Sequence, residues 1–238
     1  MQSPRRAVES VEQDPGLPSG PEECFAGYGV MGVSFSSGHI LALRHFPASS
    51  IGPGYTSVWI RNPAGVWTMH GTIDPASSCP RYFGRALEAA STGGISIRWR
   101  DGYSLSVEVG EGVDLSWELT LAATPVTRLM SAVSVNVPER LWRNRTFLRA
   151  LGAVAGPLLG AGRVALTGRV PNGQIFGARP RQLWRVREST ARLSGHSLGQ
   201  LAALPVQDRL GDFWIPQRGI FMVGSTVFDP AAHHISRS

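Results

Sequence analysis

The clearest pattern along the chain is a strict alternation of apolar and polar residues between residues 95 and 121. Three successive runs show it, at 95–100, 104–109 and 114–121. A period of two is typical of β-strands that bury one face. The pattern therefore predicts an antiparallel three-stranded meander whose apolar face consists of Ile95, Ile97, Trp99, Leu105, Val107, Val109, Leu115, Trp117, Leu119 and Leu121.

Keeping the apolar residues on one face also predicts the register of this meander. A three-residue turn between the first two runs pairs Trp99 with Leu105, whereas a two-residue turn would mix the faces. Closing the second turn around residues 110–112 places Glu108 opposite Asp114 on the polar face. The remaining predicted pairs are Ile97–Val107, Val109–Val113, Val107–Leu115 and Leu105–Trp117.

Further hairpins are predicted on both sides of the meander. Residues 29–46 read as two strands around Ser36-Ser37-Gly38, and residues 57–69 as a hairpin whose turn contains Pro63 and Gly65. Asn172-Gly173 is a strong hairpin signal, and residues 219–228 are predicted to form a final strand. The predicted fold class is mainly β: an antiparallel, lipocalin-like barrel or sandwich.

One amphipathic helix is predicted at about residues 138–156, where the apolar period changes from two to that of a helix. Residues 126–137 are predicted to form another strand before it. The polar, proline-containing residues 1–24 are predicted to be a disordered tail, and residues 231–238 a frayed C-terminus. Residues 25–230 then form a single β-rich domain.

Composition excludes several classes of enzyme. The 238 residues are 42% hydrophobic, and all 23 basic residues are arginine. Without lysine there can be no Schiff-base decarboxylase or aldolase, no pyridoxal-phosphate enzyme, no P-loop and no protein-kinase site. The net charge is +6, but residues 1–24 carry −3. The arginines are spread along the chain rather than clustered among aromatics, so nucleic-acid binding is not expected.

The two cysteines, Cys24 and Cys79, are too few for a disulfide framework. No Cys or His spacing resembles a metal site, so neither a metal nor another cofactor is expected. The N-terminal residues lack the apolar core of a signal peptide. These features predict a cytoplasmic protein with reduced thiols.

Three groups could carry acid–base catalysis. Glu108 and Glu118 lie with Asp114 on the polar face of the meander, and paired carboxylates can supply an acid and a base. His70 is a further proton donor candidate. The simpler interpretation of the carboxylates is a solvated outer face. Cys79 next to Arg81 could be an activated thiol, or part of a loop that anchors Tyr82 and Phe83 in the core.

Aromatic residues on the predicted strands could line a cavity for a ligand. Core filling is the competing interpretation. The basic helix could lie on an anionic membrane, or pack across one end of the barrel. The candidate ligand-binding residues are Trp59, Trp67, Trp99, Trp117, Trp184, Tyr82 and Arg81.

Ser57-Val58-Trp59 with Trp67, the stretch CPRYFG at 79–84 and the stretch GRVPNGQIFGARPRQLWRV at 168–186 occur together. In this combination the chain resembles a group of uncharacterised actinobacterial proteins over about residues 27–228. Its strand order and Trp-rich hairpins look like the lipocalin-like folds of carotenoid hydratases and isoprenoid or polyketide cyclases. This second resemblance concerns the fold, and it transfers no catalytic residue.

Three hypotheses follow. In the first, the barrel binds a hydrophobic small molecule (a lipid, isoprenoid or polyketide-like compound) in a Trp-lined cavity, and arginines place an acidic headgroup. In the second, the same cavity supports cofactor-free hydration, cyclisation or isomerisation. In the third, the basic helix makes the protein a membrane- or protein-surface module.

Overall fold

The computed structural model describes residues 2–110 and 112–230. Ten strands follow one another across a single sheet in the order β5-β4-β3-β2-β1-β14-β10-β8-β7-β6, and β9 and β11 pair with β10. Within the described residues the path ends at β5 and β6. The sheet is mixed, because β4 and β5 are parallel and the other pairs are antiparallel. Its strands are β1 (Glu23–Ser34), β2 (Ile40–Ser49), β3 (Tyr55–Arg61), β4 (Trp67–Gly71), β5 (Ala89–Thr92), β6 (Ile95–Trp99), β7 (Ser104–Val109), β8 (Leu115–Ala122), β9 (Thr167–Arg169), β10 (Ile175–Leu193), β11 (His196–Ser197) and β14 (Ile220–Phe228).

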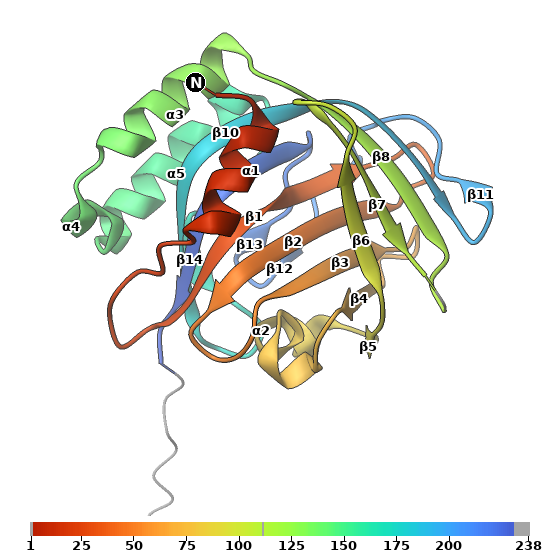
Figure 1. The fold of residues 1–238 in the computed structure, drawn as a ribbon, viewed down its shortest axis with the longest axis horizontal. Helices are drawn as coiled ribbons and strands as arrows, with labels where there is room; N and C mark the ends of the chain where they lie inside the picture. Colours follow the sequence, from red (N-terminus) through yellow and green to blue (C-terminus); the bar gives the residue numbers. More distant parts are fainter. Residues whose placement is uncertain (1, 111, 231–238) are drawn as a thin grey trace, which may run out of the picture.

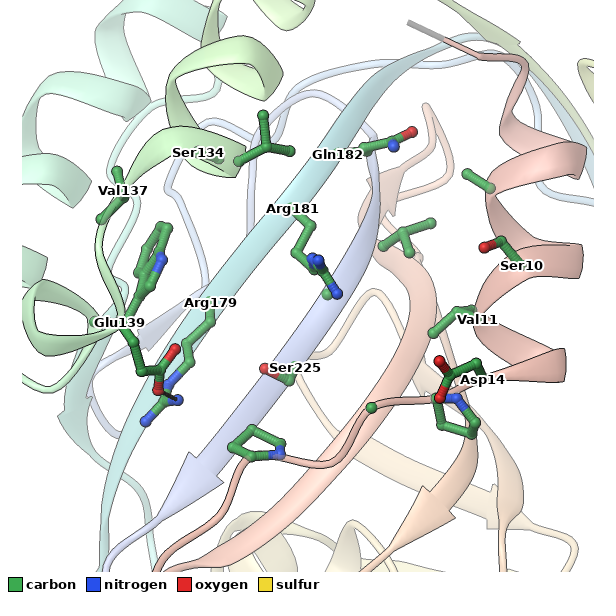
Figure 2. Close-up of a pocket in the computed structure, with 18 of the residues that line it drawn as sticks. Ser10, Val11, Asp14, Ser134, Val137, Glu139, Arg179, Arg181, Gln182 and Ser225 are labelled. Carbon is green, nitrogen blue, oxygen red and sulfur yellow. Dashed lines mark hydrogen bonds and ion pairs between the residues drawn. The ribbon is translucent and has the colours of Figure 1, made fainter.

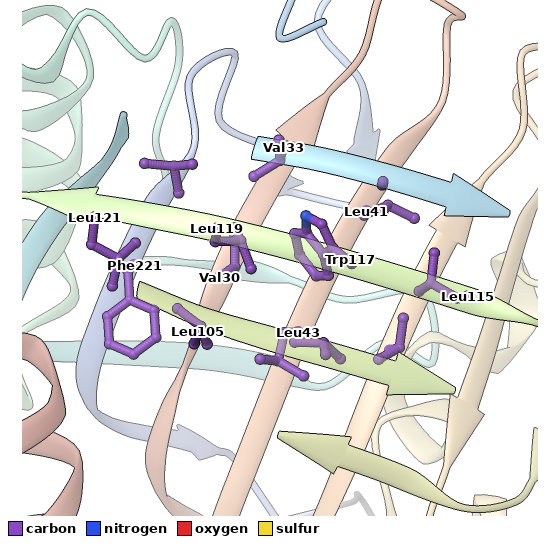
Figure 3. Close-up of a cluster of buried hydrophobic side chains, with 14 of the residues drawn as sticks. Val30, Val33, Leu41, Leu43, Leu105, Leu115, Trp117, Leu119, Leu121 and Phe221 are labelled. Carbon is purple, nitrogen blue, oxygen red and sulfur yellow. The ribbon is translucent and has the colours of Figure 1, made fainter. Parts of the chain in front are cut away.

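The sheet curls strongly, so that its two arms face each other as a half-barrel (Figure 1). Leu41 and Leu43 on β2 pack in one core with Leu105 and Trp117 from β7 and β8 (Figure 3). Trp117 and Trp184 are fully buried in this inner core. The mainly β class is therefore confirmed, whereas the predicted antiparallel barrel is a mixed half-barrel with two edge strands.

The predicted hairpins are present, and one register needs a correction. Trp99 pairs with Leu105 as expected, but Val107 pairs with Trp117 instead of Leu115. The second turn is longer than predicted, so Glu108 lies opposite Ser116 rather than Asp114. A shift of two residues keeps every apolar side chain on the same face, which is why alternation could not distinguish the two registers.

The helices are more numerous than predicted. They are α1 (Pro4–Gln13), α2 (Pro80–Phe83), α3 (Pro125–Asn136), α4 (Glu139–Trp142) and α5 (Arg145–Leu159), with short 3₁₀ turns at Pro75–Ser77 and Gly84–Ala86. The single helix predicted at 138–156 is two helices, because Asn144 caps a new helix and its side chain accepts from the Phe147 N–H. Gly160, in a left-handed conformation, ends α5.

The strand predicted at 126–137 is wrong, because these residues form α3. Thr124 and Thr127 form a reciprocal capping box, and Pro125 occupies the first turn. The buried positions of α3 have helical spacing, but they are the polar residues Thr127, Ser131 and Ser134. A search for an apolar stripe therefore missed this helix. The Ser131 hydroxyl accepts a hydrogen bond from the backbone N–H of Leu183, so α3 covers the edge of β10.

The prediction of a disordered tail at residues 1–24 is also wrong. Ser3 caps α1, Pro4 follows it, and Ala7 and Val8 are buried in the inner core. The backbone N–H of Arg5 donates to the carbonyl of Gly102 at the β6–β7 turn, and Glu12 accepts from the hydroxyl of Tyr28 on β1. Helix α1 therefore contacts both arms of the half-barrel and lies across its opening (Figure 1). The predicted fraying of 231–238 lies outside the described residues.

A second apolar core lies on the convex side of the sheet. It contains Trp59, Trp67, Tyr82 and Phe176, and α2, α5 and a small separate sheet pack over it. The two strands of that sheet are β12 (Arg209–Leu210) and β13 (Phe213–Trp214).

Candidate functional site

A cleft of about 560 Å³ lies beside the opening of the half-barrel. Helix α1 forms one wall, the end of α3 and the start of α4 form the other, and β10 and β14 form the floor (Figure 2). Its polar lining comes from distant parts of the sequence: Gln2, Ser10, Asp14, Ser19, Ser134, Glu139, Arg143, Arg179, Arg181, Gln182 and Ser225.

Arg179 on β10 is the most unusual group of this cleft. Its side chain is 6% exposed. Its Nη1 donates to Glu139 Oε1 at 2.5 Å, while its Nε is buried and has no hydrogen-bond partner. Glu139 is 63% exposed, so the ion pair reaches solvent through the carboxylate. A buried N–H without an acceptor costs about 1–3 kcal/mol, which a ligand that accepts from it would recover.

A β-bulge brings the polar groups of β10 to this cleft. The pairing of β10 with β14 shifts between Pro180 and Gln182, which leaves Arg181 without a partner on β14. Pro180 lacks an N–H, and such a residue is found in sheets mainly at edges and bulges. Gly224 opposite it permits the close approach, because a Cβ there would lie 2.3 Å from the carbonyl oxygen of Arg179. The bulge allows Arg179, Arg181 and Gln182 all to line the cleft.

Arg181 and Gln182 are neighbours on β10 and differ in exposure. The Oε1 of Gln182 is buried and has no partner. Arg181 is exposed and, within residues 2–110 and 112–230, forms no ion pair. The cleft thus presents guanidinium donors, the groups that bind a carboxylate or another oxyanion.

The convex core holds a buried arginine of a different kind. Arg44 lies 4.6 Å over the ring of Trp59, and its Nη1 donates to the carbonyls of Val30 and Leu43. Desolvation lowers the pKa of Arg44 to about 10, so it keeps its charge at neutral pH. The cavity beside it has a volume of only about 40 Å³ and cannot hold an organic ligand.

Cys79 faces this small cavity rather than solvent. Its Sγ is 3.3 Å from the hydroxyl of Tyr55 and 3.4 Å from that of Ser57. Burial raises the pKa of the Cys79 thiol, against the hydrogen bonds and Arg44, which lower it. A buried thiol with a raised pKa is a poor nucleophile, and this favours the interpretation of 79–84 as an anchoring loop.

The tryptophans proposed as ligand-binding residues are divided between the two cores. Trp99, Trp117 and Trp184 contact the inner core, and Trp59 and Trp67 lie in the convex core. None of the five lines the cleft. Trp59 and Tyr82 line the 40 Å³ cavity. Their geometry is that of core-filling side chains, and a ligand role for them stays a prediction.

Arg81 and Tyr82 belong to a polar cluster at the edge of the convex core. Both donate to Glu23, with Arg81 Nη2 at 2.6 Å and the Tyr82 hydroxyl at 2.5 Å. Desolvation acts to raise the pKa of Glu23, but the hydrogen bonds from Arg81, Tyr82 and Gln174 outweigh it and lower the pKa. This cluster ties α2 to β1 and leaves Arg81 engaged in an ion pair.

The three candidate catalytic residues do not form one site. Glu108 is exposed, and Glu118 forms an exposed ion pair with Arg100 on the polar face of the meander. His70 lies on β4, in the other arm, and its Nδ1 contacts the Ser91 hydroxyl. Burial lowers the pKa of His70. Their catalytic role stays a prediction, and no group of three or more metal-ligating side chains occurs in the described part of the chain.

The residues that line the cleft were not proposed from the sequence. One signal was present: Pro180 between two arginines, inside an otherwise strand-like stretch, is typical of a bulge. No signal connected that stretch with Glu139, which is 40 positions away, or with α1, which lines the same cleft from the other end of the chain.

Among the described residues, no helix has the length and apolar character needed to span a bilayer.

Comparison with known proteins gives a likeness at the level of the fold. The acetoacetate decarboxylase of Legionella pneumophila subsp. pneumophila str. Philadelphia 1 is 11% identical, with a TM-score of 0.40 over 90% of this chain and 86% of that one. A second acetoacetate decarboxylase structure is 10% identical, with a TM-score of 0.41 over 91% of this chain and 90% of that one. No family model and no curated protein matches the sequence.

The likeness concerns the arrangement of the chain, a strongly curled, mainly β half-barrel with a few helices. The more specific resemblance to the lipocalin-like folds of hydratases and cyclases stays a prediction.

Proposed function

We propose that the protein binds a small organic molecule with an acidic group in the cleft between α1 and α4. The observation that carries the proposal is the buried Nε of Arg179, which has no partner and belongs to a side chain lining a cleft of about 560 Å³. Arg181, with no ion pair among the described residues, supplies the accessible charge. An acidic group would satisfy both guanidinium groups.

The rest of the lining favours an apolar body next to that acidic group. Ala7 and Val11 of α1 face the cleft from one side, and Val137 and Trp142 from the other. Val223 on the floor belongs to both the cleft and the inner core. The proposed ligand is therefore that of the first sequence-based hypothesis, a hydrophobic molecule with an acidic headgroup. The proposed site is different: it is the cleft at the opening of the half-barrel instead of a Trp-lined barrel interior.

A fluorescent fatty acid tests the proposal. We expect 11-(dansylamino)undecanoic acid to bind with saturable fluorescence enhancement, and its methyl ester to bind at least tenfold more weakly, because the ester lacks the charge that the arginines recognise. Arg181→Gln should weaken binding of the acid by about tenfold. Arg187→Gln, an exposed arginine paired with Glu188 on the same strand, is the matched control.

Three results would contradict the proposal. They are no saturable binding of the acid, equal affinity for acid and ester, or the same effect of Arg181→Gln and Arg187→Gln. Arg179→Gln is a second variant for the buried position. It removes the guanidinium group, including the unpaired Nε–H, and should also weaken binding of the acid.

A further inference from the structure

Helices α3 and α5 present an apolar surface on the convex side of the half-barrel. An apolar groove of about 250 Å³ runs between them above β10 and β14. The large side chains on its rim are unusually exposed: Leu129 63%, Val133 49%, Val154 57% and Leu158 54%. We call these four residues and the groove between them the α3–α5 face. A soluble surface seldom exposes four such side chains in one place.

Exposed small apolar residues accompany the α3–α5 face. They are Ala132 on α3 and Ala150, Ala153 and Pro157 on α5. On α3 the buried positions are the polar residues Thr127, Ser131 and Ser134. Leu129 and Val133 of the same helix are therefore left exposed.

The segment that carries this face is rich in positive charge. Residues 124–165 contain six arginines and a single acidic residue, Glu139. Arg128 is next to Leu129 on α3, and Arg149 lies just over one turn before Val154 on α5. Within the part of the chain that the structure describes, Arg128, Arg140 and Arg149 form no ion pair, and each is exposed.

We propose that the α3–α5 face docks on an anionic membrane surface. The exposed Leu and Val side chains enter the boundary between headgroups and acyl chains, and the flanking arginines contact lipid phosphates. The charge pattern favours this occupant over an apolar protein partner, because it is complementary to a surface of uniform negative charge. The helices lie on the membrane and do not cross it, since α5 has only 15 residues.

Vesicle co-sedimentation tests this proposal without any cleft ligand. We expect the protein to bind vesicles of equal parts phosphatidylglycerol and phosphatidylcholine at low salt, and not vesicles of phosphatidylcholine alone. Replacing both Val154 and Leu158 with Glu should abolish binding, and the exposure of both side chains leaves the fold intact. Arg149→Gln should weaken the partition coefficient by about fivefold.

Two control variants separate this face from general effects of charge. Tyr103→Glu places an acid at an exposed aromatic of the β6–β7 turn, and Arg187→Gln removes an exposed arginine elsewhere. Both should bind vesicles within about twofold of the wild type. Circular dichroism and thermal unfolding of each variant confirm that it is folded.

The proposal is overturned if the wild type does not bind anionic vesicles at low salt, or if the Val154/Leu158 double variant binds as well as the controls do. It is also overturned if sedimentation equilibrium shows a dimer that the same double variant dissociates while vesicle binding is absent. That result would assign the face to a second copy of the chain. None of these outcomes depends on the fatty-acid titration, so this proposal and the proposed function can fail separately.

Discussion

Trp117 and Trp184 are equally buried, but we expect them to contribute differently to the stability of the fold. Both are fully buried in the inner core. The indole Nε1–H of Trp117 donates to the Ser189 hydroxyl at 2.8 Å, whereas that of Trp184 has no partner. An unpaired buried donor reduces the net benefit of an aromatic residue.

We therefore expect Trp117→Phe to destabilise the protein more than Trp184→Phe, by about 1 kcal/mol. Both variants lose a similar buried volume, but only the first leaves the Ser189 hydroxyl without its donor. Urea unfolding followed by circular dichroism measures the difference. Equal losses, or a larger loss for Trp184→Phe, would show that the Trp117–Ser189 hydrogen bond contributes nothing.

The buried position of His45 leads us to expect that the stability of the protein depends on pH. Desolvation lowers its pKa below the ordinary value of 6.5, although the nearby carboxylate of Glu12 acts in the opposite direction. His39 and His70 are also buried enough for their pKa values to be lowered. The unfolded chain then binds more protons than the folded one just below pH 6.5, so the free energy of unfolding falls as the pH falls.

The melting temperature should accordingly be lower at pH 5.5 than at pH 7.5. His45→Asn should narrow that difference, since asparagine can retain the hydrogen bond to Thr56 and does not titrate. The exposed His196 serves as the control position for the same substitution. The lowered pKa of Glu23 affects stability only below about pH 4.5, outside this range. An unchanged difference in His45→Asn would exclude His45 as a source of the pH dependence.

Among the strands, β10 connects the largest number of other elements of the sheet. It pairs with β14 and then β11 along one side and with β9 and β8 on the other, and its bulge builds the floor of the cleft. In the sequence, residues 183–186 and 191–193 each read as a short strand, separate from the hairpin at Asn172-Gly173. Alternation is lost at the bulge, so a pattern of period two cannot show that these pieces are one strand.

The tight turn after β10 offers a test at the level of an element. Ser194 and Gly195 both have positive φ, 49° and 77°, as in a type I′ turn between Leu193 and His196. Asparagine tolerates this conformation better than serine does. Ser194→Asn should raise the free energy of unfolding by about 0.5 kcal/mol. Ser194→Val should lower it, and a higher melting temperature for the valine variant would contradict the assignment of the turn.

At the scale of the whole molecule, α1 completes the half-barrel. Its residues Ala7 and Val8 enter the inner core, and its outer residues form a wall of the cleft. The same helix therefore connects stability to the proposed binding site. Ser3-Pro4 is a common helix beginning, and the prolines at 15, 18 and 21 fit the end of a helix as well as they fit a disordered tail.

Val8→Asp should destabilise the protein by about 3 kcal/mol, because Val8 is 1% exposed and a carboxyl group in the inner core has no partner there. Glu9→Ala, at the exposed neighbouring position, should cost no more than about 0.5 kcal/mol, since it removes only the pair with Arg5. Chemical denaturation measures both values. A near-neutral Val8→Asp would mean that α1 does not pack on the core in solution.

The sequence by itself determined the β class, the principal hairpins and the inward face of the meander, because alternation and turn residues act over a few neighbouring positions. It also excluded lysine chemistry through composition alone. The tertiary structure decided the half-barrel, the docking of α1, the helical state of 125–136 and the cleft around Arg179. Each of these depends on contacts between residues far apart in the chain, and in α3 the buried side chains are polar, so no local pattern of hydrophobicity records them.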